Sequence, residues 1–145
     1  MKKWWLSIAA VLLMMVFVGC SNFSFTRPIG TPTVTISISG DTLVQDERTG
    51  NWILSFTINA HTLPGSAAGV INNFALSSGS YLSAGLRVEQ CEPTAETDCG
   101  PYSIDYSLTF PSLPPENSYV ITAYTVVGQN GSSYTIDMPE PLVIR

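Results

Sequence analysis

The amino-acid sequence predicts an all-β protein, a β-sandwich of about seven short strands, and three observations lead to this prediction. Apolar and polar residues alternate with period two over most of the chain after residue 31, as in strands that bury one face. Clusters of Gly, Pro, Asn and Asp, which favour tight turns, separate the alternating segments. The chain is only 12% charged and is rich in Thr, Ser, Val, Ile and Tyr, so strands are favoured over helices or disorder.

Four strands are predicted in the first part of the domain, over residues 34–38, 52–59, 70–76 and 82–90. The first two alternate most clearly, whereas the other two are weaker candidates, and their order in the sheets is left open. Gly40 and Asp41 predict a turn after the first strand. A further turn is predicted over residues 46–51, and another over residues 77–80.

Three more strands are predicted over residues 102–110, 119–127 and 133–138. The first of these has the cleanest alternation in the chain and ends at Pro111. Asn130 and Gly131 tolerate a positive φ and therefore predict a hairpin between the other two strands. Pro139 and Pro141 lack a backbone N–H, so the last segment either runs along a sheet edge or breaks before residue 142.

Leu113, Pro115 and Tyr119 have the spacing of the tyrosine corner found in fibronectin type III and related immunoglobulin-like domains. The sequence resembles those domains here, and the resemblance implies that residues 32–145 form an immunoglobulin-like (fibronectin type III-like) β-sandwich. It also implies a structural role for Tyr119, whose hydroxyl would bond to the backbone just upstream. Trp52 resembles the core tryptophan of type III domains. The inter-sheet cysteine pair of antibody domains is missing from the sequence.

Residues 1–19 have the form of a signal peptide. Lys2 and Lys3 precede an apolar run over residues 4–18, which ends just before Cys20. We expect this run to be a signal helix, because it is shorter than the roughly 18 residues that mark a membrane span. A simple membrane anchor and an ordinary secretory signal with an incidental cysteine are the two alternatives.

The end of this leader resembles the lipobox of bacterial lipoproteins. Val18, Gly19 and Cys20 match the lipobox, and Phe17 stands where leucine is usual. The resemblance implies cleavage after Gly19 and attachment of diacylglycerol to the sulfur of Cys20. Acylation of the new amino terminus, with palmitate or a similar chain, is part of the same chemistry. Two or three such chains anchor a protein firmly, since each buried methylene contributes about 0.8 kcal/mol.

The same resemblance predicts where the protein is located. Ser21 follows the lipidated cysteine, whereas Asp in that place retains lipoproteins at the inner membrane in some organisms. We therefore expect a cell-envelope protein anchored by lipid to the outer membrane, on either its periplasmic or its surface face. Residues 20–31 would be a lipidated tether spanning at most about 35 to 40 Å.

The charge of the expected mature chain excludes some classes of partner. Four arginines and no lysine stand against eleven acidic residues after cleavage, which leaves a net charge of about −7. Phosphate backbones and anionic head groups repel such a chain, so nucleic acid is not expected as a partner. The length suits one domain and is too short for two independent cores.

Cys91 and Cys99 remain as a pair once Cys20 carries lipid, and export places them where disulfides persist. We expect them to bond to each other and to contribute about 2 to 3 kcal/mol, because the loop that they close is short. A zinc site is the alternative. It needs about four ligands, and His61 is the only histidine of the chain.

No catalytic set is apparent, and we predict that the protein is not an enzyme and needs no cofactor. His61 could act as the base of a hydrolytic triad, but the Gly-x-Ser-x-Gly motif of many hydrolases is absent from the sequence. Glu89, Glu92, Glu96 and Asp98 cluster around the expected disulfide. We interpret them as a solvated acidic loop, with a weak calcium site as the alternative.

Tyrosines could form a patch that stacks on sugars or on another protein; the candidates are Tyr81, Tyr102, Tyr106, Tyr124 and Tyr134. Tyr102 and Tyr106 share a strand face with apolar residues, so core packing is the simpler explanation for those two. Tyr124 alternates out of phase with Tyr119, and we expect it to point outward.

The sequence thus predicts a non-enzymatic bacterial lipoprotein that acts as an adhesive, scaffolding or envelope-assembly module. Its expected partners are the membrane, through lipid, and another envelope protein or a glycan. The alternative is a small ligand-binding lipoprotein that holds calcium or glycan with the acidic loop between Cys91 and Cys99, or with exposed tyrosines.

Overall fold

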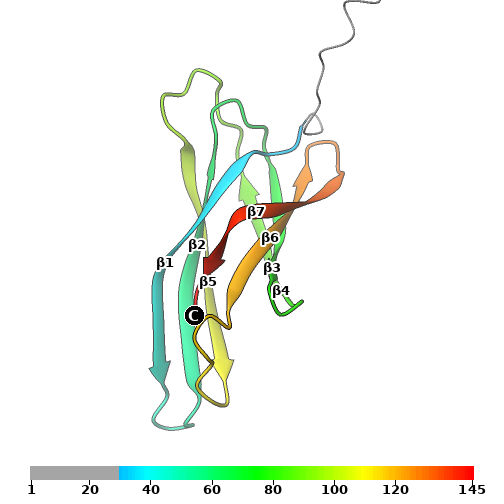
Figure 1. Ribbon diagram of the computed structural model, residues 1–145. Coiled ribbons are helices and arrows are strands. Elements are labelled where there is room, and N and C mark those ends of the chain that lie inside the picture. The colour runs from blue at the N-terminus through cyan, green and yellow to red at the C-terminus, as the bar shows by residue number, and fades with distance from the viewer. Residues whose placement is uncertain (1–29) are drawn as a thin grey trace, which may run out of the picture.

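The structure is a computed structural model and describes residues 30–145. It confirms an all-β fold of seven strands in two antiparallel sheets (Figure 1). The strands are β1 (Val34–Gln45), β2 (Trp52–Thr62), β3 (Gly69–Leu76), β4 (Tyr81–Val88), β5 (Cys99–Phe110), β6 (Val120–Gly128) and β7 (Ser133–Val143). Within the described range there is no helix, and hence none long and apolar enough to cross a membrane. The predicted signal peptide and Cys20 lie outside the described residues.

The first sheet has the strand order β1-β2-β5, and the second has the order β4-β3-β6-β7. All of the paired strands are antiparallel. This order answers what the sequence left open, because β3 lies inside the second sheet and β4 lies at its edge. Four strands therefore have one free edge each, namely β1, β5, β4 and β7.

The core lies between the inner faces of the two sheets, as the period-two alternation predicts. Leu54, Phe56 and Ile58 of β2 are buried, and the residues between them face outward. From the second sheet, Ile71 and Phe74 of β3 are completely buried against them. Burial of each such side chain is worth about 1.5 to 3 kcal/mol, so these rows supply the main driving force for folding.

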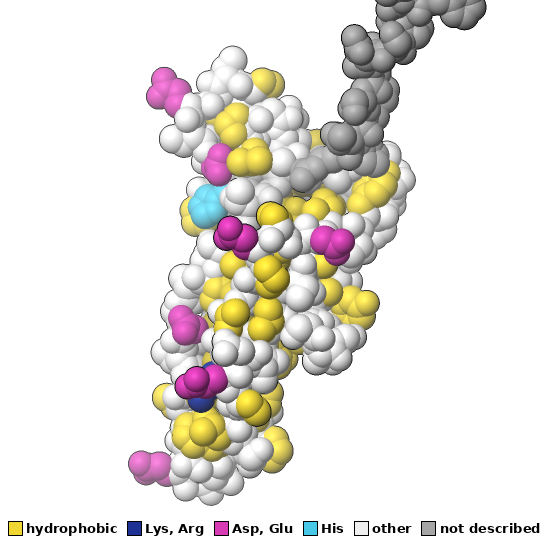
Figure 2. All heavy atoms as spheres, viewed as in Figure 1, with side chains coloured by type: hydrophobic (Ala, Val, Ile, Leu, Met, Phe, Trp, Pro, Cys, Tyr) yellow, Lys and Arg dark blue, Asp and Glu magenta, His cyan; other side chains and the backbone are white. Residues whose placement is uncertain are grey.

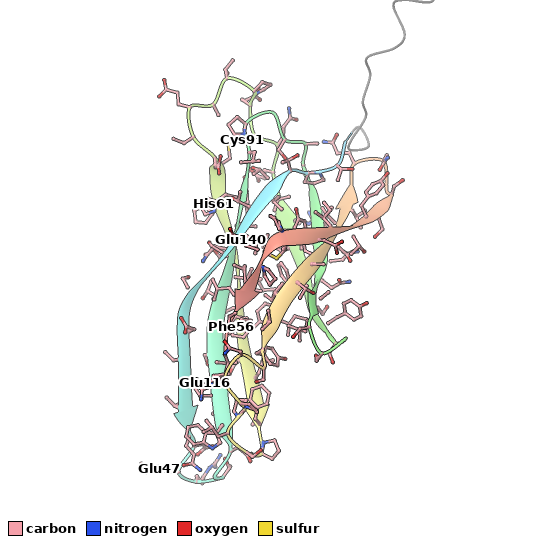
Figure 3. All side chains as sticks on the ribbon, in the orientation of Figure 1. Glu47, Phe56, His61, Cys91, Glu116 and Glu140 are labelled. Atoms are coloured by element: carbon pink, nitrogen blue, oxygen red, sulfur yellow. A yellow bond between two sulfur atoms is a disulfide. The ribbon has the colours of Figure 1, made fainter. Side chains whose placement is uncertain are left out.

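Tyr106 of β5 ties the two sheets together along one side of the sandwich. Its ring stacks on Phe56 of the neighbouring strand, with the ring centroids 5.3 Å apart (Figure 3 labels Phe56). Its hydroxyl donates a hydrogen bond of 2.8 Å to the carbonyl oxygen of Ser83 on β4 in the other sheet. Burial raises the pKa of Tyr106 to about 12, because the charged phenolate is poorly solvated there.

The predicted turn at Gly40 and Asp41 is wrong, because β1 continues through these residues to Gln45. The register of β1 against β2 shifts between Ser39 and Thr42, so the chain forms a bulge and not a turn. Gly40 takes up the positive φ of 65° that the bulge requires. The turn predicted over residues 46–51 is confirmed and joins β1 to β2.

The C-terminal hairpin is also confirmed. The N–H of Gly128 donates to the carbonyl of Ser132 at 3.1 Å, which closes the loop around Gly131. Of the two alternatives for the last segment, the edge strand is the one observed: β7 carries Pro139 and Pro141 along the edge of the second sheet. An edge strand tolerates proline because one side of it needs no backbone donor.

The chain enters the domain across the end of the second sheet, beside the β6–β7 hairpin (Figure 1). The carbonyl of Gly30 accepts a hydrogen bond of 3.2 Å from the N–H of Gln129. Pro32 then passes so close to β3 that a Cβ atom added at Gly69 would lie 2.3 Å from the Cγ of Pro32. Gly69 is therefore required for this crossing, which fixes the end of the sandwich at which any preceding segment is attached.

Candidate functional site

The predicted disulfide is present between Cys91 and Cys99, with their Cα atoms 5.7 Å apart (Figure 3 labels Cys91). Cys91 is fully buried. Its N–H donates to the carbonyl of Ser66, and its carbonyl accepts from the N–H of Gly65, both at 3.0 Å. The disulfide thus ties the loop before β5 to the first residue of β5, and the main-chain bonds of Cys91 hold this loop against the loop before β3. Since both sulfur atoms are bonded to each other, they are not available as zinc ligands.

The four carboxylates of the calcium candidate, Glu89, Glu92, Glu96 and Asp98, are all exposed. Within residues 30–145, no three or more His, Cys, Asp or Glu side chains lie together in a way that could hold a metal ion. The fold therefore does not bring these four residues into one site. They are solvated side chains of the loop that the disulfide closes and of the residues just before it.

The five candidate tyrosines are dispersed. Tyr81 is 66% exposed at the start of β4, whereas Tyr124 is only 4% exposed. The prediction that Tyr124 points outward is wrong, because β6 has one extra residue against β3 between Ile121 and Ala123, which changes the phase of the alternation. Tyr102, Tyr106 and Tyr134 are half-buried and pack against the core. The tyrosines therefore do not make the sugar-stacking patch considered from the sequence.

His61 lies on β2, half-exposed, and its cross-strand neighbour on β1 is Thr35 (Figure 3 labels His61). Farther along the same outer face, small polar side chains bond to one another. Asn59 donates to the Oγ of Ser39 at 2.8 Å and accepts from the Oγ of Ser103 at 2.7 Å. This face of the first sheet is polar and carries little charge.

The residues of the predicted tyrosine corner all lie in the loop between β5 and β6. Leu113 is 49% exposed. The N–H of Tyr119 donates to the carbonyl of Arg145 at 2.9 Å, and its ring makes a T-shaped contact with Phe110, with 5.7 Å between the centroids. Burial raises the pKa of Tyr119. The hydroxyl bond that the resemblance implies stays a prediction.

Trp52, the other residue of that resemblance, is half-buried at the start of β2, whereas Leu54, two residues on, is completely buried. The inner face of β2 is therefore filled by its aliphatic residues and Phe56, and Trp52 lies at the end of this row.

A groove of about 400 Å³ lies between the edge strands β1 and β7. Its floor is apolar and its rim is polar; the apolar lining is Val34, Ile36, Leu63, Tyr124, Ile136, Met138, Pro139 and Leu142, and the rim includes Asp137 and Glu140. Figure 2 shows hydrophobic side chains along the middle of this face, and Figure 3 labels Glu140 where β1 and β7 approach each other. Sequence reasoning missed the groove, because strand order decides which edges meet.

A second hollow, of about 330 Å³, lies farther along the same side and is more polar. Asp41 of the β1 bulge, Glu116 of the loop before β6 (labelled in Figure 3) and Arg145 contribute charged side chains to it. The Nε of Arg145 donates to the carbonyl of Pro114 at 3.4 Å, which holds this residue against the loop.

No family model matches the chain, and no curated protein matches it either. Among solved structures, the X-ray structure of the structural genomics target SoR45 is similar, with 14% identity, a TM-score of 0.42, and coverage of 75% of this chain and 83% of that chain. A Bordetella pertussis protein given the name ApaA is similar with 15% identity, a TM-score of 0.40, and coverage of 79% and 94%. At these values, neither similarity supports a statement about function.

Proposed function

We propose that this protein is a bacterial lipoprotein, anchored to the outer membrane by lipid on Cys20, and that its sandwich is a non-enzymatic adhesive, scaffolding or envelope-assembly module. The basic, apolar leader that ends in Val18, Gly19 and Cys20 supports the anchor. The lipid would supply the membrane affinity, because the expected mature chain has a net charge of about −7 and would be repelled by anionic head groups.

We also propose that the sandwich is immunoglobulin-like. The two antiparallel sheets have three and four strands, and the chain passes from the first sheet to the second between β2 and β3. Both features support this assignment. The arrangement differs from that of antibody constant domains in one strand, since β4 pairs with β3 in the second sheet. Domains of this architecture present loops at their ends and strand edges at their sides as binding surfaces.

The observation that carries the proposed role is the groove between β1 and β7. It has an apolar floor, and the part of β1 beside it, residues 34–39, has a regular register and a free edge, so it offers side-chain pockets and main-chain hydrogen-bonding groups together. This combination suits an extended peptide segment, which binds by adding a strand and placing alternate side chains in pockets. A partner protein of the envelope is therefore favoured over a small molecule.

The anchor is tested by the intact mass of the mature N-terminal peptide from membranes and by a carbonate wash of those membranes. We expect a diacylglyceryl-modified Cys20 at the amino terminus, and we expect Cys20→Ala to release the protein into the wash. Ser21→Ala is the matched control, because it alters the adjacent residue and keeps the lipidated sulfur. An unmodified thiol, or Cys20→Ala protein that resists the wash as well as the wild type, would contradict the proposal.

The groove is tested with the same membranes by replacing Ile136 with lysine, which puts a charge at the apolar floor near the strand edge. We expect this change to reduce recovery of the envelope partner by chemical cross-linking. Val44→Lys, at an exposed position of β1 outside the groove, is the control. Equal cross-linking in the two variants would show that the groove is not the contact surface.

A further inference from the structure

The four free strand edges of the sandwich are not equally protected against pairing with another strand. Natural sheets block their edges with bulges, prolines or charges, because an unbroken edge is a template for a further strand. The register of β1 is broken at Gly40 and that of β4 at Gly85, both residues with a φ of 65°. The edge of β7 is broken by Pro139 and Pro141. Each of these three edges is therefore interrupted within the strand, and no long regular stretch is left on it.

The β5 edge has the longest uninterrupted stretch. Its register against β2 runs from Tyr102 to Phe110 without a shift, and its one irregularity lies before this stretch, at Gly100 and Pro101. The stretch contains no proline, glycine or lysine, and Asp105 is its only charged residue. In the described part of the chain, no strand pairs with the outer side of β5. A regular row of main-chain N–H and C=O groups is thus available along this edge.

The inner face of the same stretch is incompletely covered. The inward residues are apolar but only half-buried, in contrast to the buried inward residues of β2; they are Tyr102, Ile104, Tyr106, Leu108 and Phe110. Tyr106 reaches across to Ser83, but β4 does not cover the whole row. A strand added beside β5 would bury this apolar row further while it satisfies the free main-chain groups.

We infer that the β5 edge pairs with the β5 edge of a second copy of this chain, antiparallel and about a two-fold axis at Tyr106. This register pairs Ile104 with Leu108 and Tyr102 with Phe110, so every inward apolar residue meets another one. On the outer face, Asp105 lies opposite Ser107 of the second copy. A two-fold axis at Asp105 is disfavoured, because it would place two carboxylates directly opposite each other.

The inference deepens the proposed scaffolding role and rests on it, since lipid anchoring would concentrate copies of the chain on one membrane. The result is a continuous six-stranded sheet with the order β1-β2-β5-β5-β2-β1 across two protomers. The groove between β1 and β7 lies on the other side of each sandwich and stays free for a different partner.

Ser107→Asp tests the interface with one added charge. Ser107 is exposed on the outer face, so the change leaves the core intact. In the dimer, the two-fold symmetry creates two such contacts, and in each of them the new carboxylate lies opposite Asp105 of the other copy. We expect the mature lipoprotein in detergent to sediment as a dimer and this variant to show a dissociation constant raised about tenfold or more. Ser37→Asp is the matched control, because it adds the same charge to the same face at the opposite edge, and it should stay dimeric.

A second measurement does not depend on detergent. In membranes containing the full chain, Ser107→Cys should give a covalent dimer with a short bis-maleimide, whereas Ser37→Cys should not. Monomeric wild type, equal dimerisation of both Asp variants, or cross-linking through residue 37 alone would each overturn the inference. The intact mass of the N-terminal peptide from the same samples distinguishes failure of this inference from failure of the proposed anchor. A lipidated monomer would contradict the β5 pairing alone, and an unmodified Cys20 thiol would contradict the lipid anchor.

Discussion

Removal of the disulfide by Cys91→Ala with Cys99→Ala should lower the thermal midpoint without unfolding the domain at room temperature. The bond joins residues eight positions apart, and the loop-closure relation for so short a loop gives a stabilisation of about 2.5 kcal/mol at 25 °C. Unfolding entropy near 2.1 cal/mol/K per residue gives about 0.24 kcal/mol/K for a domain of this size. The expected loss is therefore about 10 °C in Tm. Alanine is preferred to serine, because Cys91 is fully buried and a hydroxyl there would lack a partner.

Circular dichroism melts of three samples measure this effect: the oxidised wild type, the reduced wild type and the double alanine variant. The reduced and alanine samples should coincide, since both retain the main-chain bonds of Cys91 to Gly65 and Ser66. A loss below about 3 °C would mean that the bond does not restrict the unfolded chain as the loop-closure argument requires. A loss above about 20 °C would show that the bond maintains native packing around Cys91. It would also refute the argument that the bond acts mainly by lowering the entropy of the unfolded chain.

Two further predictions concern packing. Tyr106→Phe removes the hydroxyl that bonds to Ser83 and should cost about 1 kcal/mol at neutral pH. Burial raises the pKa of Tyr106 to about 12 from 10.0, so the stability of the wild type should fall as the pH rises above about 10. Urea midpoints measured between pH 9 and pH 11 should therefore fall less in the variant than in the wild type. Equal falls in the two proteins would show that Tyr106 does not cause the pH dependence. Gly69→Ala should cost about 1 to 3 kcal/mol, because its Cβ would meet the Pro32 ring and the carbonyl of Val127. Pro32→Ala should recover part of that loss in a double-mutant cycle, and strict additivity would argue against the clash.

Sequence patterns predicted the strands well where alternation was unbroken, as in β2 and β5, because one buried face imposes a period of two. They failed at irregularities. Glycine at position 40 is typical of a turn, but here its positive φ forms a bulge. β1 continues beyond Gly40 because its following residues pair with β2. The same cause explains the wrong prediction for Tyr124, since the extra residue that β6 has against β3 exchanges the inward and outward positions from Tyr124 onward.

The candidate sites also differ in how far the sequence alone could predict them. The disulfide was predictable, because two cysteines close in sequence can meet without help from the fold. The groove between β1 and β7 was not, because its lining comes from strands separated by most of the domain and depends on the two edges facing each other. The dispersal of the tyrosines and carboxylates likewise depends on strand phase and loop paths that composition does not encode.

The entry of the chain beside the β6–β7 hairpin determines how the domain would respond to mechanical force. β1 begins at that end and runs away from it, hydrogen-bonded to β2 along almost its whole length, and β2 is bonded to β5 in turn. A pull between an anchored N-terminus and a binding partner at β5 would act parallel to these strands. The ladders would then bear the load in shear, with many bonds strained together, and not be peeled open one bond at a time. Such a geometry suits a small domain that must hold under tension.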